Sequence, residues 1–510
     1  MTMPARPGAA IALAVLLLPP AALPAAGADD LRLVEAVRQR NEPAVRCLLA
    51  ERAPVNAAQP DGATALHWAV HWNDLASVEL LLRAGADVAA VNDYGVTPLS
   101  LASTNGDPAV ARRLLESGAD ANAASPVTGE TVLMTAARTG VAAVVEALLD
   151  HGADPGAQET RHGQTALMWA AAEGHVDAAR LLIARDADLH ARSHVGSTPL
   201  LFAARSGDPE LVRLLLDAGA DVNDEAADGS TALLVAAVRS NVALARLLLE
   251  HGADPDRGAG FNPLHWAAGN WRNVDTVADA AVRADNNEWS GLEGLEGQAR
   301  RAFVRLLLDF GADPNAPAEG TPGRYAGGQA RGGYLAGATP FLAATRTGDT
   351  RLMQILLDAG ADPLQPNDRG TTPLMIAAGV GFRGYSPVPE ADALAAVALC
   401  VELGGDVRAA DATGETALHG AAYRGLSGSD TIIRFLVDRG AELNVENGLG
   451  WTPLAIAEGV YFGASDTRSD DMAALFRTLG AEPTPPGIER DVNIARLNAQ
   501  RAGDRQGGSR

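Results

Sequence analysis

A repeat of about 33 residues runs through most of this chain, and it restricts the possible folds more than any other feature. In the copy spanning His194–Ala226, Thr198 can cap a helix and Pro199 suits the first helical position. Gly207 breaks that helix, and Gly219 can end a second helix in the left-handed conformation. A unit of two short helices and a turn cannot bury its apolar stripes alone, so the copies must stack. The helix-starting threonine or asparagine recurs at positions 64, 97, 131, 165, 198, 231, 262, 339, 372, 416 and 452.

The openings and closings of these units point to a known family. The segment Thr-Ala-Leu-His67 is a typical opening, and Gly85-Ala-Asp87 is a typical closing. With a 33-residue period, this pattern resembles the ankyrin repeat family. The resemblance covers about Asp29 to Pro483. It implies an all-α solenoid of about twelve helix-turn-helix units, with β-turn tips and insertions in the C-terminal repeats. It also implies that the histidine of each opening is a structural hydrogen-bonding residue.

The first 28 residues have the pattern of a signal peptide. Arg6 supplies a positive start, Ala9–Leu18 is a short apolar run, and Ala26-Gly-Ala28 is a cleavage site of the A-x-A type. The apolar run is shorter than a permanent membrane-spanning helix requires. We therefore expect an exported soluble protein, periplasmic or secreted, with no membrane insertion after cleavage.

The rest of the chain divides by the regularity of its repeats. Residues 29–60 are predicted to form an N-terminal capping repeat, because their helices carry a charged outer face. Residues 61–259 keep the period and are predicted to be regular repeats. Residues 260–484 hold repeats with insertions, and residues 485–510 are predicted to be a disordered tail.

The net charge indicates which classes of partner the chain can bind, and the cysteine positions indicate the state of its thiols. The formal net charge is −22, and every basic residue is an arginine. Such an acidic chain is a poor match for nucleic acid or for anionic lipid, so a protein partner is expected. Cys47 and Cys400 both lie in apolar helical stripes, which predicts buried free thiols.

No motif for catalysis, a metal or a cofactor is present in the sequence. The histidines are scattered or occupy repeat positions, and no H-E-x-x-H, Cys–His cluster or glycine-framed serine occurs. The recurrent aspartates follow Gly-Ala at turns, where a short carboxylate accepts local N–H bonds. We therefore predict no catalytic residue, no metal and no cofactor.

The insertions of the last third carry most of the tyrosines, five of six. Per-repeat insertions often map to a binding face, and tyrosine and arginine are enriched at interface hot spots. The alternative is that these loops cover helix ends or lock the C-terminal repeats together. The candidate partner-binding residues at or beside insertions are Arg324, Tyr325, Tyr334, Phe382, Tyr385, Tyr423 and Tyr461.

A second candidate surface is the concave face, onto which the family resemblance places the residues after each buried alanine pair. A row of arginines there can take carboxylates from a partner. The same arginines can equally pair with the chain's own aspartates and glutamates. The candidates on this face are Trp72, Arg138, Arg205, Arg239, Arg346 and Arg424.

These observations favour a non-catalytic protein-binding scaffold that works outside the cytoplasm through the concave face, the turn tips and the aromatic insertions. One alternative is a small-molecule or enzymatic site formed under the insertions of repeats 8–10. Another is a secreted effector that binds a host protein.

Overall fold

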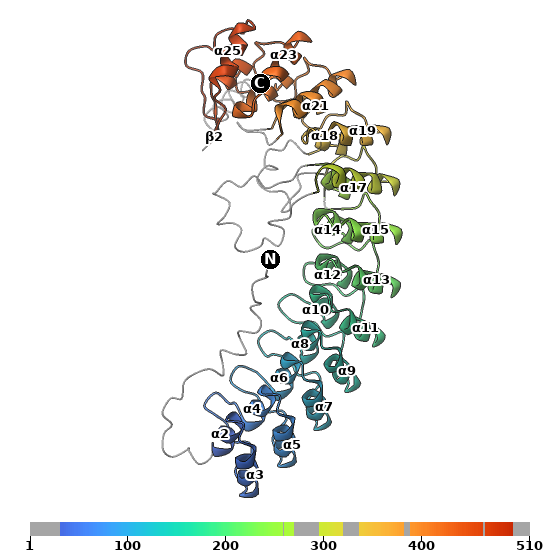
Figure 1. The fold of residues 1–510 in the computed structure, drawn as a ribbon, viewed down its shortest axis with the longest axis vertical. Helices are drawn as coiled ribbons and strands as arrows, with labels where there is room; N and C mark the ends of the chain where they lie inside the picture. Colours follow the sequence, from blue (N-terminus) through green and yellow to red (C-terminus); the bar gives the residue numbers. More distant parts are fainter. Residues whose placement is uncertain are drawn as a thin grey trace, which may run out of the picture. The chain divides into compact units, whose positions relative to one another are not determined.

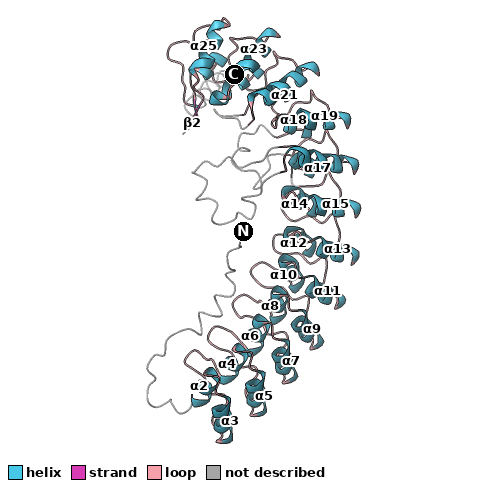
Figure 2. Cartoon of the chain, in the orientation of Figure 1, coloured by secondary structure: helices cyan, strands magenta, loops and turns pink. Residues whose placement is uncertain are grey.

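The computed structural model describes residues 31–258, 260–269, 295–319, 336–381, 388–462 and 465–492. In these residues the chain forms successive pairs of short helices, drawn in order from blue to red (Figure 1). Almost all of the regular structure is helical (Figure 2). The helices belong to two compact units, one ending at His194 and the other beginning at Val195.

The first unit contains five helix pairs. The first helices of the pairs pack on one another in a row, and so do the second helices. The row of first helices comprises α2 (Arg32–Arg38), α4 (Ala65–His71), α6 (Pro98–Asn105), α8 (Val132–Thr139) and α10 (Ala166–Glu173). The row of second helices comprises α3 (Glu42–Ala50), α5 (Leu75–Arg83), α7 (Pro108–Glu116), α9 (Ala142–Asp150) and α11 (Val176–Ala184). A turn-bearing loop precedes each helix of the first row from α4 onward.

The second unit continues the pairing but contains the insertions. Its first helices are α12 (Pro199–Ser206), α14 (Ala232–Val238), α16 (Pro263–Ala268), α18 (Pro340–Thr345), α20 (Pro373–Ala378), α22 (Ala417–Tyr423) and α24 (Pro453–Ala457). Its second helices are α13 (Pro209–Asp217), α15 (Val242–Glu250), α17 (Gly297–Asp309), α19 (Thr350–Asp358), α21 (Glu390–Glu402), α23 (Asp430–Asp438) and α25 (Asp470–Thr478). The 3-10 turn η4 (Gly425–Ser427) precedes α23, and strands β1 (Tyr461–Phe462) and β2 (Ser465–Asp466) pair antiparallel between α24 and α25.

Helix α6 shows how local sequence sets where a helix begins and ends. At α6 the Thr97 hydroxyl accepts the backbone N–H of Ser100 at 3.1 Å, which satisfies one of the unpaired donors of the first turn. Pro98 follows at the position where no N–H is needed. The helix ends at Gly106, whose φ of 69° is readily adopted only by glycine. Leu99 and Ala102 on its buried side are 1% and 0% exposed.

Asparagine side chains join neighbouring repeats at the start of several turns. Asn122 donates to the carbonyl of Gly152 at 3.0 Å and accepts the N–H of Asp154 at 2.7 Å. Asn56, Asn223 and Asn315 make the same pair of bonds to the next repeat. Because each asparagine bonds to the backbone of the following unit, it fixes the spacing between repeats.

The histidines of the openings also join repeats, as the sequence predicts. The Nε2 atoms of His67, His265 and His419 lie 3.0, 2.9 and 3.0 Å from backbone carbonyl oxygens of the following repeat. Burial lowers the pKa of His265 and of His419 to about 4. Both rings are therefore neutral at physiological pH, which suits a structural hydrogen bond.

The prediction for the two thiols is half wrong. Cys400 is buried, and burial raises its thiol pKa to about 12. Cys47 is exposed. It lies on α3, where Val45 is the only buried residue, because a helix of the first repeat has a neighbouring repeat on one side only.

The C-terminal segment also differs from the prediction, because residues 485–492 lie against the last repeat. The indole N–H of Trp451 donates to the carbonyl of Glu489 at 2.6 Å. The Arg490 guanidinium donates to the Glu458 carboxylate at 2.8 Å and to the carbonyl of Gly459 at 2.9 Å. This segment thus covers the open end of the array. The predicted signal peptide and residues 493–510 lie outside the described residues.

Removing the Asn122 side chain should weaken the coupling between two repeats. We expect Asn122→Ala to lower the free energy of unfolding by about 1–2 kcal/mol, since two inter-repeat hydrogen bonds are lost. Asn122→Asp keeps the acceptor for Asp154 and should lose less. Urea unfolding followed by far-ultraviolet circular dichroism measures the change. Glu146→Ala, at an exposed position of α9, is the control, and equal stability of N122A and this control would contradict the role of the asparagine.

Candidate functional site

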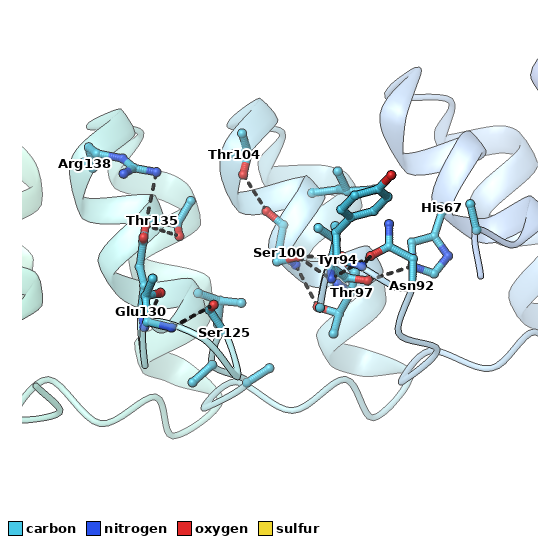
Figure 3. A pocket seen from close by; sticks show the side chains of 18 residues that line it. His67, Asn92, Tyr94, Thr97, Ser100, Thr104, Ser125, Glu130, Thr135 and Arg138 are labelled. Carbon is cyan, nitrogen blue, oxygen red and sulfur yellow. Dashed lines mark hydrogen bonds and ion pairs between the residues drawn. The ribbon is translucent and has the colours of Figure 1, made fainter. Parts of the chain in front are cut away.

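The first unit contains a cavity of about 400 Å³ on the side of the turn-bearing loops. It lies between the Tyr94 loop (residues 92–97) and the Thr128 loop (residues 123–130), with α6 and α8 contributing side chains. Figure 3 shows this cavity, hereafter the Tyr94 pocket, with its polar lining residues labelled. Its size falls within the range of pockets that hold a small molecule or a large side chain.

The Tyr94 loop is held rigidly by one asparagine. Asn92 Oδ1 accepts the backbone N–H groups of Tyr94 at 3.0 Å and of Val96 at 2.9 Å. Gly95 takes a φ of 74°, which closes the turn. The N–H of Asp93 donates to the carbonyl of Asp61 at 2.9 Å, so this loop is tied to the preceding one. Tyr94 is therefore presented on a fixed backbone while 54% of its surface stays exposed.

A network of polar side chains forms the opposite wall (Figure 3). Glu130 Oε1 accepts a hydrogen bond from the Thr135 hydroxyl at 3.1 Å and forms an ion pair with the Arg138 guanidinium, 3.1 Å away. The guanidinium also lies over the Trp169 ring, 4.8 Å from its centroid. Arg138 is thus held between a carboxylate and an aromatic face, which fixes the position of its charge.

An aromatic cluster lies one repeat earlier, at the end of α4. The rings of Trp68 and Trp72 stack with centroids 6.4 Å apart, and His71 meets Trp72 edge-on at 4.7 Å. Trp68 is almost fully buried, and its indole N–H donates to Gln59 at 2.9 Å. Trp72 keeps 39% of its surface exposed. The cluster therefore presents one exposed aromatic residue supported by two others.

Comparison with known proteins agrees with this architecture. A family model of three ankyrin repeats matches residues 33–125, 119–193 and 200–279, and a single-repeat model matches residues 336–368 and 413–448. The chain belongs to the ankyrin repeat family. A solved structure that it resembles is the ankyrin repeat domain of Bcl-3, described as a unique member of the IkappaB protein family. That match has 31% identity and a TM-score of 0.37, and it covers 40% of this chain and 92% of that one. The family-model matches confirm the predicted family, and the helix pairs confirm the all-α solenoid class.

Among the predicted arginines of the concave face, several occupy equivalent positions within their ankyrin repeats. Arg138 and Arg205 are partly exposed near the ends of α8 and α12, and each lies over an aromatic ring. The Arg205 guanidinium is 5.9 Å from the centroid of the Phe202 ring. Arg239 and Arg346 directly follow α14 and α18 and are also partly exposed. Their contact with a partner stays a prediction.

The expectation that Tyr423 and Arg424 lie on an accessible face is wrong, because both side chains are buried. The Tyr423 hydroxyl donates to Glu415 Oε1 at 2.8 Å. The Arg424 guanidinium donates to the carbonyls of Val388 at 2.7 Å and Gly428 at 3.1 Å. Val388 and Gly428 belong to the inserted segments of two repeats. Here the insertions cover the helix ends, which was the alternative interpretation of these loops.

The other aromatic candidates fall outside what the structure describes. Arg324, Tyr325, Tyr334, Phe382 and Tyr385 lie in the undescribed segments. Tyr461 begins β1, and only its backbone is described. The small-molecule alternative under the insertions of repeats 8–10 depends on these segments. It therefore stays a hypothesis.

Sequence reasoning missed Tyr94, the one tyrosine outside the last third. Its signal is an aromatic residue directly before a turn glycine, at a position where other repeats carry Asp61, Thr128 or His162. Such a residue has no core to enter, because the turn projects away from the helices. The predicted concave residues Trp72 and Arg138 lie in the same unit as Tyr94.

A buried carboxyl group occupies the same repeat position as Glu130 but in the second unit. Glu415 is 5% exposed, and its Oε1 accepts from Tyr423 at 2.8 Å and from Asn447 at 2.9 Å. Its Oε2 is buried without a hydrogen-bond partner among the described residues. Burial, with a smaller contribution from Asp411, raises the pKa of Glu415 to about 7. An orphaned carboxyl oxygen in such a site favours the protonated form.

Within the described residues, no three histidine, cysteine, aspartate or glutamate side chains are grouped so that they could hold a metal ion. The described helices are all too short or too polar to span a bilayer.

The Glu415 carboxyl group should make stability depend on pH. Since its folded pKa of about 7 exceeds the ordinary value of 4.5, folding favours the protonated form. Its contribution to the free energy of unfolding is complete below about pH 4.5 and is lost as pH rises through about 7. We expect the wild-type urea midpoint to fall more between pH 5 and pH 8 than that of Glu415→Gln. Glu446→Gln, at an exposed site, should retain the wild-type dependence, and an identical dependence in E415Q would contradict this assignment.

Proposed function

We propose that this ankyrin repeat protein is a non-catalytic scaffold that binds a protein partner outside the cytoplasm. Ankyrin repeats are generally protein-interaction modules, and the family membership supports the general part of this proposal. The proposal that the first unit contributes to partner binding is supported by the exposed apolar side chains of that unit. Trp72, Val91, Tyr94 and Val127 are 39%, 55%, 54% and 83% exposed, and all lie on turn-bearing loops or at the end of a first-row helix.

These side chains suit recognition because the backbone around them is already fixed. Tyr94 lies on a loop closed by Asn92, and Trp72 rests on a buried tryptophan. Rigid aromatic residues lose little conformational entropy when a partner docks, so more of the contact energy appears as affinity. Exposed aromatic side chains are also enriched at protein–protein interfaces.

Action outside the cytoplasm rests on the N-terminal residues. The positive start, the apolar run Ala9–Leu18 and the Ala26-Gly-Ala28 site together favour export and cleavage before Asp29. A secreted effector with a host protein as partner would use the same binding surfaces, and it would be recovered from the medium instead of the periplasm.

Capture from envelope extracts tests the binding surface. We expect the full chain to retain one or a few proteins from the envelope of its source organism, and Trp72→Ala/Tyr94→Ala to retain at most a tenth as much, because truncated hot-spot aromatics cost about 2 kcal/mol or more. The control is Glu146→Gln on α9, which should retain the wild-type amount. Equal retention by the double variant would show that this face does not carry binding.

Export is tested by locating the mature chain and sequencing its N-terminus. In a Gram-negative host we expect the protein in the periplasm or medium with Asp29 as its first residue. Ala28→Leu should accumulate uncleaved, because a bulky side chain does not fit the small-residue cleavage site. Wild-type protein that stays uncleaved in the cytoplasm would contradict the localisation.

A further inference from the structure

We propose that the Tyr94 pocket takes an arginine side chain from a basic segment of the protein partner. This inference rests on the proposed scaffold function and specifies the chemistry of its partner. Three properties of the pocket support it: its mixed lining, a carboxylate oxygen that is still open to a ligand, and an exposed aromatic ring at its edge.

The lining combines an apolar floor with polar walls. Leu101 and Val132 are buried beneath the cavity, and the hydroxyl-bearing residues Thr104 and Thr135 are among those that line it. A long side chain with an aliphatic stem and a polar head matches such a surface, because its stem contacts the floor while its head reaches the walls.

The charge on the pocket favours a cationic head. Glu130 is partly exposed, and its hydrogen bond from Thr135 and its ion pair with Arg138 both fall on Oε1, so Oε2 can accept from a ligand. Burial lowers the pKa of His67, another lining residue, which keeps that ring neutral. Arg138 is already paired with Glu130, and Asp93 adds a negative charge beside Tyr94. With a net charge of −22, the whole chain attracts basic segments and repels acidic ones.

The Tyr94 ring makes arginine a better match than lysine. In this unit guanidinium groups already rest on aromatic faces, Arg38 on Trp68 at 6.0 Å and Arg138 on Trp169 at 4.8 Å. Tyr94 offers a further ring, at the pocket edge and 54% exposed. A planar guanidinium can stack on that ring while the Glu130 carboxylate on the opposite wall attracts its charge, whereas an ammonium is more strongly hydrated and cannot stack.

Selection from a random dodecapeptide library on the immobilised full chain tests the proposal. We expect the retained peptides to be enriched in arginine. Replacement of the key arginine by citrulline, its neutral isostere, should weaken binding at least tenfold, and replacement by lysine should weaken it less. Affinity is measured by fluorescence polarisation of the labelled peptide.

Variants then locate the site. Glu130→Gln retains an acceptor for Thr135 and Arg138 but removes the charge, and it should weaken the arginine peptide about tenfold. Tyr94→Leu should weaken it by a similar factor, whereas Tyr94→Phe retains the ring and should bind as the wild type does. Glu146→Gln is the charge-matched control on the far helix of the same repeat, and circular dichroism verifies that each variant is folded.

The outcomes separate this inference from the scaffold function. Retained peptides that lack arginine, or that bind E130Q and Y94L as tightly as the wild type, would overturn the arginine pocket while leaving a protein-binding scaffold. Retained peptides rich in aspartate or glutamate would overturn the assigned charge. A wild-type chain that retains no peptide above background would count against both proposals.

Discussion

Stacking against a neighbour is the constraint on which the rest of this structure depends. Each repeat contributes two helices of about two turns, and such helices are marginal in isolation. They are stable here because, within each compact unit, the first helix of one repeat packs on the first helix of the next, and most of the second helices do the same. The asparagine and histidine side chains then bond to the backbone of the adjacent repeat. Helix packing and these hydrogen bonds thus set the same distance between neighbouring repeats. The residues on the loop side of each repeat can therefore differ without loss of the fold.

Two repeats place different residue pairs at the same positions on the loop side, and the two pairs differ in burial. In repeat four, a glutamate before the capping threonine and an arginine seven residues after it form a partly exposed pair, Glu130 with Arg138. In repeat eleven the same positions hold Glu415 and Tyr423, and the pair is buried. The first arrangement holds its charged groups at the protein surface. The second places a carboxyl group where ionisation is unfavourable, as its raised pKa indicates.

The insertions contribute to the cohesion of the C-terminal repeats. Arg424 is wholly buried and bonds to Val388 and Gly428, which lie in the inserted segments of two different repeats. Arg490 extends the array by holding the C-terminal segment to Glu458 and Gly459 of the last repeat. An open end of a repeat array exposes apolar surface, so a covering segment of this kind stabilises the last unit.

Sequence alone determined the repeat, the helix starts and ends, and the structural role of the histidines. These features are set by contacts within one unit or between identical positions of successive units, and a fixed period in the sequence reports such contacts directly. The prediction that Arg138 and Trp72 lie on the concave face came from the resemblance to the ankyrin repeat family, through their position within the repeat.

Only the tertiary structure decided which of these positions are accessible. Arg138 and Tyr423 hold the same repeat position, and only the segment packed around each one makes the first partly exposed and the second buried. Cys47 is exposed because its repeat has a neighbouring repeat on one side only. Tyr94 is a candidate binding residue because its loop lines a cavity together with residues of a second repeat. Burial of a side chain depends on residues that are far away in the chain and do not belong to the repeating pattern. The repeat pattern therefore does not predict where these residues pack.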